Sequence, residues 1–387
     1  MDEKLVSILT TIYHRSCFEF YSKKFDNEEV SQGLDYDSFV EFFEDLCVDT
    51  NGEPHYIPQL YFTELFKQFD SKGDSVIDWE EFEKMWSPWL KTILRPRSAF
   101  IIVDVQNDFI NGTLSVVRCP AGHRGEEVVP VINSLLTTVP FDLVVYSYDW
   151  HPNDHISFYE NFRTRTIIGR NGYIFNDGTC TEVVNEDEEE TKEVIDTIED
   201  IKDAELADAI KPKPDVQDLN NLQVFETVTF EGPPRTDQKL WPRHCVQGSW
   251  GARLHPELLV TGRETIDVFK GTKSNIDSYS AFWDNGKLSE TGLNSELKSR
   301  NITDVYVCGL AYDVCVGATS SHANEYGYRT VLVNDASRGV DCSDIAATKD
   351  RLINQSAMVV DSDRVGDMVM GRDRRPELAF RLAQTLI

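Results

Sequence analysis

The stretch Val305-Tyr-Val-Cys-Gly-Leu-Ala-Tyr-Asp-Val-Cys315 decides how the rest of the chain is interpreted. Residues 305–308 are a short apolar run rich in β-branched residues, which is typical of a buried parallel strand. Gly309 is expected to end that strand, and residues from Val314 to Tyr326 recur at helical spacing. The predicted unit is therefore a strand, a sharp turn and a helix. Cys315 falls in the first turn of that helix, where unpaired N–H groups and the helix dipole favour a thiolate.

The second part of the chain continues this alternation of strands and helices. Five further apolar segments are predicted to be strands, at residues 99–104, 143–148, 265–269, 330–333 and 357–360. Helical or loop segments separate them. Such alternation predicts an α/β fold with a doubly wound parallel sheet flanked by helices, which binds its ligands beyond the carboxyl ends of its strands.

The first part of the chain has a different pattern, in which apolar residues recur at helical spacing. This pattern predicts a small all-α region with helices around residues 4–20, 39–46, 62–69 and 82–90. The segment Arg95-Pro-Arg97 marks a boundary, so we expect a helical domain over residues 1–96 and an α/β domain over residues 97–387. A strongly acidic tract at about residues 182–215 is interpreted as a solvated insertion with no assigned chemistry.

An acidic loop of twelve residues separates the last two predicted helices. Read as a calcium loop, it places Asp70, Asp74, Asp78 and Glu81 at positions one, five, nine and twelve. Helix, acidic loop and helix is the pattern of an EF-hand. Lys72 stands where a third oxygen ligand is expected, and Ser75 replaces the turn glycine. The sequence therefore leaves open whether this loop binds calcium, and an earlier loop at residues 33–35 has no ligand set.

Composition restricts the classes of partner and compartment. The formal net charge of −28 argues against binding of nucleic acid or an anionic membrane through the whole surface. No apolar run is long enough to cross a bilayer, and the first residues do not resemble a secretory signal. The eight cysteines are scattered rather than arranged as a disulfide framework. These features predict a cytoplasmic protein, with the nucleus as an alternative.

Chemically useful side chains follow several of the predicted strands. Asp104 ends the first strand and is a candidate general base, whereas Lys270 ends the third and could hold an anion. Taken alone, each also has an ordinary role in a turn or at the surface, and a lone cysteine such as Cys315 is most often a small buried hydrophobe.

A candidate metal set follows the second strand. Asp149 and His151 lie two apart, so in extended chain both side chains point the same way. His244 could complete an Asp, His, His set with positions open for water and substrate. His155 is either a fourth ligand, a neighbouring donor or a turn residue.

Together these residues resemble the nicotinamidases, within the isochorismatase-like cysteine hydrolases. The matching segments occur in family order: Asp-Val-Gln-Asn-Asp-Phe at 104–109, Asp-Trp-His-Pro at 149–152, Trp-Pro-Arg-His-Cys-Val-Gln-Gly at 241–248, Lys-Gly at 270–271, Tyr-Ser-Ala-Phe at 279–282 and Gly-Leu-Ala-Tyr-Asp-Val-Cys at 309–315. An added EF-hand-like region is similar to that of animal nicotinamidases. The sequence departs from the family pattern in the long stretch between His155 and Trp241.

The resemblance implies a catalytic triad of Asp104, Lys270 and Cys315, with Cys315 forming a thioester. It also implies an oxyanion hole at the N–H groups of Ala311 and Cys315, and a cis peptide between Leu310 and Ala311.

The resemblance further implies a metal that orients the substrate ring, and an aromatic pocket. Zinc is the expected metal at Asp149, His151 and His244, with iron and manganese as alternatives. The pocket residues are Phe109, Trp241 and Tyr279.

The function expected from these features is hydrolysis of nicotinamide to nicotinate and ammonia, in NAD salvage. Two alternatives stay open. One is a related hydrolase of another small amide, which would lack the metal set. The other is a calcium-responsive binding protein with an inactive hydrolase domain, which the presence of all three triad residues disfavours.

Overall fold

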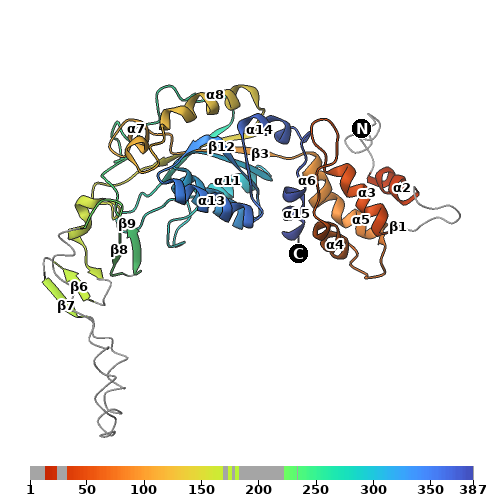
Figure 1. Ribbon diagram of the computed structural model, residues 1–387, viewed down its shortest axis with the longest axis horizontal. Coiled ribbons are helices and arrows are strands. Elements are labelled where there is room, and N and C mark those ends of the chain that lie inside the picture. Colours follow the sequence, from red (N-terminus) through yellow and green to blue (C-terminus); the bar gives the residue numbers. More distant parts are fainter. Residues whose placement is uncertain are drawn as a thin grey trace, which may run out of the picture.

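A computed structural model describes residues 14–23, 33–168, 173–176, 179–182, 222–232 and 234–386. Figure 1 shows a helical part formed by the N-terminal residues, a central α/β body, and a small sheet on the far side of that body. The first half of the predicted helix at 4–20 and the acidic tract, apart from Glu182, lie outside the described residues. In the part of the chain that the structure describes, no helix is long and apolar enough to cross a membrane.

The N-terminal part consists of helices joined by a very short sheet. Its elements are α2 (His14–Lys23), β1 (Gly33–Leu34), α3 (Tyr36–Leu46), α4 (Gln59–Phe69), β2 (Ile77–Asp78), α5 (Trp79–Met85), a π-helical turn η1 (Trp86–Leu90) and α6 (Lys91–Leu94). Strands β1 and β2 pair antiparallel, with Leu34 opposite Ile77. The predicted apolar faces of α3 and α4 are buried, because each carries aromatic or leucine residues at helical spacing.

The core of this helical part includes the last helix of the chain, α15 (Pro376–Gln384). Phe380 stacks on Tyr61 with ring centroids 4.0 Å apart, and Trp89 Nε1 donates to the carbonyl of Ala379 at 2.7 Å. The N-terminal helices therefore pack on a segment that is more than 280 residues away in the sequence, as Figure 1 shows.

The α/β body is built on a six-stranded sheet in which every pairing is parallel. Its strands are β3 (Ser98–Val103), β4 (Leu143–Asp149), β10 (Thr265–Lys270), β11 (Asp304–Leu310), β12 (Arg329–Arg338) and β13 (Met358–Val360). Their spatial order is β10-β4-β3-β11-β12-β13, which is 3-2-1-4-5-6 when the six are counted along the chain. The direction of winding reverses between β3 and β11, where doubly wound folds bind their ligands. All six predicted strands are present.

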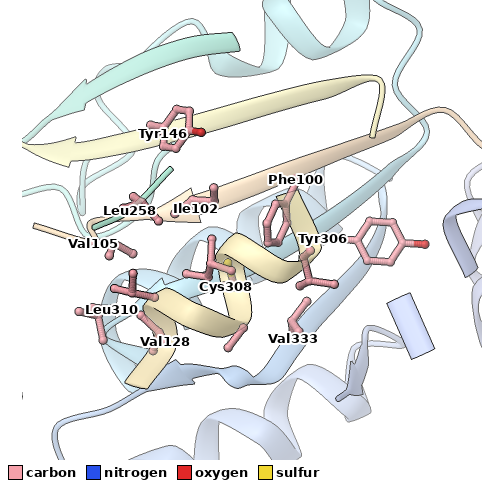
Figure 2. Close-up of a cluster of buried hydrophobic side chains, with 14 of the residues drawn as sticks. Phe100, Ile102, Val105, Val128, Tyr146, Leu258, Tyr306, Cys308, Leu310 and Val333 are labelled. Carbon is pink, nitrogen blue, oxygen red and sulfur yellow. The ribbon is translucent and has the colours of Figure 1, made fainter. Parts of the chain in front are cut away.

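Helices cover both faces of this sheet, as the alternating pattern predicts. On one face, α8 (Val128–Thr138) and α14 (Ser362–Val369) pack on side chains that include Phe100, Tyr306 and Cys308, shown in Figure 2. On the other face lie α11 (Leu293–Ser299), α12 (Gly317–Glu325) and α13 (Cys342–Asn354). The four inner strands, β3, β4, β11 and β12, bury alternate residues in each core, which explains why they are continuous apolar runs in the sequence.

A second, antiparallel sheet was not anticipated from the sequence. Its strands are β5 (Ile167–Ile168), β6 (Tyr173–Asn176), β7 (Thr179–Glu182), β8 (Thr227–Phe230) and β9 (Thr236–Lys239), in the order β7-β6-β5-β8-β9. A separate apolar cluster that includes Ile156 and Phe162 packs beneath it. Further short elements in the described part of the chain are α7 (Asn107–Ile110), η2 (Val116–Arg118), η3 (Gly125–Glu127) and η4 (Tyr159–Thr164).

The strand-turn-helix unit differs from its prediction in two details. Strand β11 continues through Gly309, whose φ is +116°, and ends at Leu310. The next element is a π-helical turn, η7 (Tyr312–Val316), and α12 begins only at Gly317. Cys315 therefore lies in the π-helical turn and not in the first turn of the α-helix. A β-carbon at Gly309 would approach the backbone oxygen of Val103 to 2.1 Å, which is why glycine allows β11 to continue beside β3.

Candidate active site

The three predicted catalytic residues and one predicted metal ligand, Asp149, meet at the carboxyl ends of four neighbouring strands. Asp104 follows β3 directly, Asp149 ends β4, Lys270 ends β10, and Cys315 follows β11. All four side chains are at least nine-tenths buried. The topology therefore gathers residues from distant parts of the sequence at the point where the winding reverses.

Lys270 contacts both other members of the predicted triad. Its Nζ lies 2.8 Å from Asp104 Oδ2 and 3.4 Å from Cys315 Sγ. The hydroxyl of Ser147 donates to Asp104 Oδ1 at 2.6 Å and so fixes the other carboxylate oxygen. Ser147 was missed in the sequence, although it lies two residues before Asp149 and so on the same side of β4.

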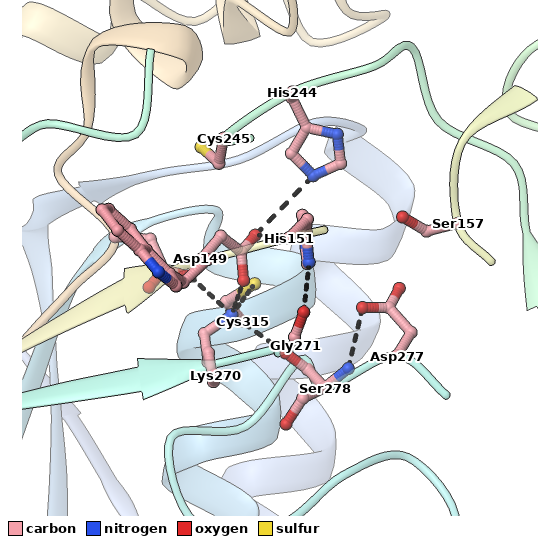
Figure 3. Close-up of polar contacts among 12 residues, drawn as sticks. Asp149, His151, Ser157, His244, Cys245, Lys270, Gly271, Asp277, Ser278 and Cys315 are labelled. Atoms are coloured by element: carbon pink, nitrogen blue, oxygen red, sulfur yellow. Dashed lines mark hydrogen bonds and ion pairs between the residues drawn. The ribbon is translucent and has the colours of Figure 1, made fainter. Parts of the chain in front are cut away.

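Lys270 also joins the triad to the predicted metal set, as Figure 3 shows. Its Nζ contacts Asp149 Oδ1 and donates to the carbonyl of Ser278 at 3.0 Å. One buried ammonium therefore faces two carboxylates and a thiol. Neither the spacing nor the family resemblance indicated the contact with Asp149.

The ionisation of the triad follows from burial and from Lys270. Burial raises the pKa of Asp104 to about 6, although the neighbouring ammonium opposes the rise. Burial also raises the pKa of the Cys315 thiol well above its usual value, and Lys270 offsets only part of this effect. For Lys270, burial would lower the pKa, but the surrounding carboxylates outweigh it and raise the pKa well above normal. The prediction that the helix start favours a thiolate is therefore wrong for the free enzyme, because desolvation dominates.

The turn that carries Cys315 has the backbone geometry implied by the resemblance. The peptide bond between Leu310 and Ala311 is cis. Ala311 and Cys315 both line the pocket. The carbonyl of Ala311 accepts from the N–H groups of Val314 and Val316, at 3.1 and 3.0 Å, which closes the turn around Cys315.

The three predicted metal ligands are brought together. The Nε2 atoms of His151 and His244 lie 3.5 and 3.7 Å from Asp149 Oδ2, and the three ligand atoms lie within 4.8 Å of one another. The Nδ1 atoms point at backbone carbonyls, of Gly271 at 2.9 Å for His151 and of Pro242 at 2.7 Å for His244. A carbonyl only accepts, so each Nδ1 carries a hydrogen, and each ring presents its Nε2 to the carboxylate of Asp149.

This arrangement attracts positive charge. Burial alone would raise the pKa of Asp149, but Lys270 and His151 outweigh it and lower the pKa well below its usual value. Three potential ligand atoms converge on one point, and backbone carbonyls orient both imidazole rings. The donor set therefore fits a divalent metal ion bound by two imidazoles and a carboxylate.

His155 lies beside the metal set and stacks on His151, with ring centroids 4.0 Å apart. Its Nδ1 is 2.7 Å from the hydroxyl of Ser157, whereas its buried Nε2 has no hydrogen-bond partner and lies 3.9 Å from Asp277 Oδ1. His151, His155 and Asp277 form a second group able to hold a cation. Asp277, which also lines the pocket, was missed, although it stands two residues before Tyr279.

The pocket is lined by the predicted aromatic residues. Phe109, Trp241 and Tyr279 all face it, and Trp241 Nε1 donates to the Tyr279 hydroxyl at 3.4 Å. Further apolar side chains complete its wall and were not anticipated: Leu114, Val116, Val314 and Val340. The pocket therefore places an apolar, aromatic cavity next to the thiol and the metal set.

The acidic N-terminal loop is arranged differently from a metal site. Asp70 accepts hydrogen bonds from the backbone of Gly73 and Ser75, at 2.8 and 2.9 Å, while Lys72 contacts Asp78. Glu81 accepts from the backbone N–H of Lys72 at 2.9 Å.

Three groups of His, Cys, Asp and Glu side chains among the described residues are compact enough to hold a metal ion. None of these groups includes Asp70, Asp74, Asp78 or Glu81. The predicted calcium ligands are therefore not gathered around one point. Ser75 does adopt the left-handed conformation usual for glycine, with a φ of +69°.

Comparison with known proteins identifies the family. Residues 182–364 match the model of the isochorismatase domain. The chain is 33% identical to the nicotinamidase of Acinetobacter baylyi over 244 residues, which is 63% of this chain and 82% of that one. It is 28% identical to the nicotinamidase of Saccharomyces cerevisiae, covering 67% and 98%. A solved nicotinamidase/pyrazinamidase from Acinetobacter baumanii superposes with a TM-score of 0.50 at 29% identity, over 70% of this chain and 98% of that one. The chain therefore belongs to the nicotinamidase family of hydrolases, and part of it matches the isochorismatase domain.

Proposed function

We propose that this enzyme hydrolyses nicotinamide to nicotinate and ammonia, as a step of NAD salvage. The observation that carries the proposal is the convergence of two sites at one pocket. Lys270 contacts both the thiol of Cys315 and the carboxylate of Asp149, so a nucleophile and a ring-anchoring group lie side by side. The nicotinamidase names of the relatives support this substrate.

The first half of the proposed reaction transfers the acyl group to the enzyme. Asp104 takes the proton of the Cys315 thiol, and Sγ attacks the carboxamide carbon. Because the pKa of Asp104 is about 6 and that of the thiol is high, the free enzyme at neutral pH holds a carboxylate base beside a neutral thiol. Lys270 and the N–H groups of Ala311 and Cys315 stabilise the negative charge of the tetrahedral intermediate.

The intermediate then collapses with loss of ammonia. Asp104 returns its proton to the leaving nitrogen, the C–N bond breaks, and a thioester remains on Cys315. A water molecule attacks the thioester carbon with Asp104 again as base, and the C–S bond breaks to release nicotinate and restore the thiol. Over both halves, one amide and one water give one carboxylic acid and one ammonia.

The metal set has a separate role in this proposal. A metal bound by Asp149, His151 and His244 would supply a ligand position for the pyridine nitrogen and so orient the ring; zinc suits this donor set, and iron or manganese are the alternatives. Phe109, Trp241 and Tyr279 would hold the ring faces. His155 could add a further nitrogen, because its Nε2 is buried and unpartnered.

The ring nitrogen gives a direct test of the substrate. Benzamide has the same carboxamide and ring size but cannot bind a metal through the ring. We expect kcat/KM for benzamide to be lower than for nicotinamide by about 10² or more, because a site built for a polar atom rejects an analogue that lacks it. Nicotinate or benzoate formation is measured by chromatography. Equal rates for the two amides would exclude ring anchoring.

Removal of a predicted metal ligand should separate binding from chemistry. In His151→Ala and His244→Ala we expect less bound metal per chain. The KM for nicotinamide should rise about tenfold or more, because the pyridine ring loses the metal that anchors it. Metal content is measured by mass spectrometry, and His255→Ala, a histidine outside the pocket, serves as the control. Full metal content with unchanged kinetics in both variants would make these histidines structural.

We further infer that the N-terminal part is a paired EF-hand-like unit that acts mainly as a packed helical appendage. The antiparallel pairing of β1 and β2 joins its two loops, and its core includes α15. The ammonium group of Lys72 contacts Asp78, one of the predicted calcium ligands, and so competes with a calcium ion for this carboxylate. Any calcium affinity is therefore expected to be weak.

Calorimetric titration of the full-length protein with calcium tests this inference. We expect no binding tighter than about 10⁻⁵ M, because an ammonium replaces an oxygen ligand. Lys72→Asp should strengthen binding by adding a carboxylate at the third loop position. A submicromolar affinity in the wild type, or a nicotinamidase rate that changes with calcium, would overturn the structural interpretation.

A further inference from the structure

The short segment between Asp104 and Phe109 contains three buried polar side chains that the proposed mechanism does not use, those of Gln106, Asn107 and Asp108. Gln106 is fully buried and Asp108 is 6% exposed. Burying such groups costs free energy unless each polar atom finds a partner. The partners of Gln106 and Asp108 are therefore informative, because most of them lie on the segments that carry the metal set, at Asp149, Cys245 and Ala252.

Gln106 holds the main chain of Asp149 from both sides. Its Oε1 accepts from the N–H of Asp149 at 2.9 Å, and its Nε2 donates to the carbonyl of the same residue at 2.9 Å. The second hydrogen of Nε2 goes to the carbonyl of Ala252, also at 2.9 Å. Every polar atom of this amide is thus used to join the end of β4 to the loop that carries His244.

Asp108 holds the residue next to His244. Its Oδ2 accepts from the N–H of Cys245 at 2.7 Å, and Oδ1 accepts from the N–H of Thr113 at 3.0 Å. Cys245 has a φ of +46°, a conformation that a residue with a side chain rarely adopts. The carbonyl of the same Cys245 accepts from the N–H of His151 at 3.0 Å. One carboxylate therefore fixes a residue, Cys245, that follows one metal ligand in the chain and binds the backbone of another.

Two glycines leave the space that Asp108 occupies. A β-carbon at Gly251 would lie 1.9 Å from Asp108 Oδ2, and one at Gly112 would lie 2.2 Å from Oδ1. Neither glycine has a positive φ, so close approach rather than conformation requires glycine at both positions. The carboxylate is thus packed from two sides and has no freedom to leave the N–H of Cys245.

We propose that Gln106 and Asp108 are positioning residues that set the distance between Asp149 and the two histidines of the metal set. Gln106 fixes the carboxylate ligand through its backbone, and Asp108 fixes His151 and His244 through Cys245. The proposal rests on the metal role given to these ligands above. Neither side chain lines the pocket or belongs to the candidate ligand set.

The test compares Gln106→Met and Asp108→Leu with Asn107→Ala. The first two replacements keep side-chain size but remove the contacts to the metal-ligand backbone. Asn107 lies between them, and its Nδ2 donates to the carbonyl of Trp250 at 2.9 Å. Asn107→Ala therefore removes a similar hydrogen bond to the same loop but leaves the contacts to Asp149 and Cys245 in place. Zinc dissociation constants are measured by competition with a chromogenic chelator, and the rate of Cys315 alkylation by iodoacetamide reports on the triad.

We expect zinc affinity to fall about 10- to 100-fold in Gln106→Met and Asp108→Leu, as is usual when a group supporting a metal ligand is lost. The KM for nicotinamide should rise more than kcat falls, and alkylation should stay within about twofold of wild type. Asn107→Ala should lose thermal stability only. If one variant does not fold, the other and Gly251→Ala, which would displace Asp108, carry the test.

Unchanged zinc affinity in both variants, or an equal loss in Asn107→Ala, would overturn the proposal, and so would a wild-type enzyme that binds no divalent metal. These outcomes are distinct from failure of the proposed function. If zinc affinity falls in the variants but the wild-type protein does not hydrolyse nicotinamide, the proposed substrate is wrong and the positioning role is retained.

Discussion

Replacement of Cys315 by alanine is expected to lower nicotinamide turnover by at least about 10³-fold while the fold remains intact, because loss of a covalent nucleophile removes the only route to a thioester. Cys315 lies 3.4 Å from Lys270 Nζ and lines the pocket. Circular dichroism should show an unchanged spectrum, and mass spectrometry after rapid quenching should detect an acyl adduct in wild type but not in the variant.

Cys308→Ala is the matched control for this prediction. Cys308 is also fully buried and lies only seven residues earlier, but its side chain packs in the apolar core beneath α8, as Figure 2 shows. We expect this variant to lose some thermal stability and to keep most of its activity. More than about a hundredth of wild-type turnover in Cys315→Ala would mean that another group acts as the nucleophile.

Replacement of Asp104 by asparagine should have the second largest effect, a loss of about 10²- to 10⁴-fold in kcat/KM, because a general base contributes rate enhancement of this size. Burial raises the pKa of Asp104 to about 6. The carboxylate is the active form, so wild-type kcat/KM should fall as the pH drops through about 6 rather than through about 4. The pH–rate profile of kcat/KM, measured in wild type and variant, checks both points.

Ser147→Ala is the informative companion, because Ser147 donates to the carboxylate that Asp104 uses as base. Loss of this hydrogen bond should raise the pKa of Asp104 further and move the acid limb to higher pH without abolishing turnover. An acid limb that persists unchanged in Asp104→Asn would assign it to another group.

The parallel sheet could be predicted because the burial of each inner strand is evident in the residues of that strand alone. Strands buried on both faces must be apolar throughout, so residues 99–103 and 305–308 show their role in the sequence itself. Catalytic residues at strand ends followed from the same reasoning, because the carboxyl ends of parallel strands meet at one edge. The assignment of roles came from the family resemblance and not from spacing alone.

Features that depend on tertiary packing were not predictable. The antiparallel sheet uses strands of two to four residues, too short for a clear alternation, and it joins segments before and after the acidic tract. The packing of α15 on the N-terminal helices pairs the two ends of the chain, as Phe380 on Tyr61 illustrates. The thiol of Cys315 was expected to be acidic from its place in the sequence, but the sequence does not show how completely it is buried.

Ammonia release from nicotinamide by the purified full-length protein, with and without a metal chelator, tests the central claim most directly. The account predicts release of one ammonia for each nicotinate formed, and loss of this activity on chelation with recovery when zinc, iron or manganese is restored. No ammonia release by metal-loaded protein over a wide range of nicotinamide concentrations would contradict the account.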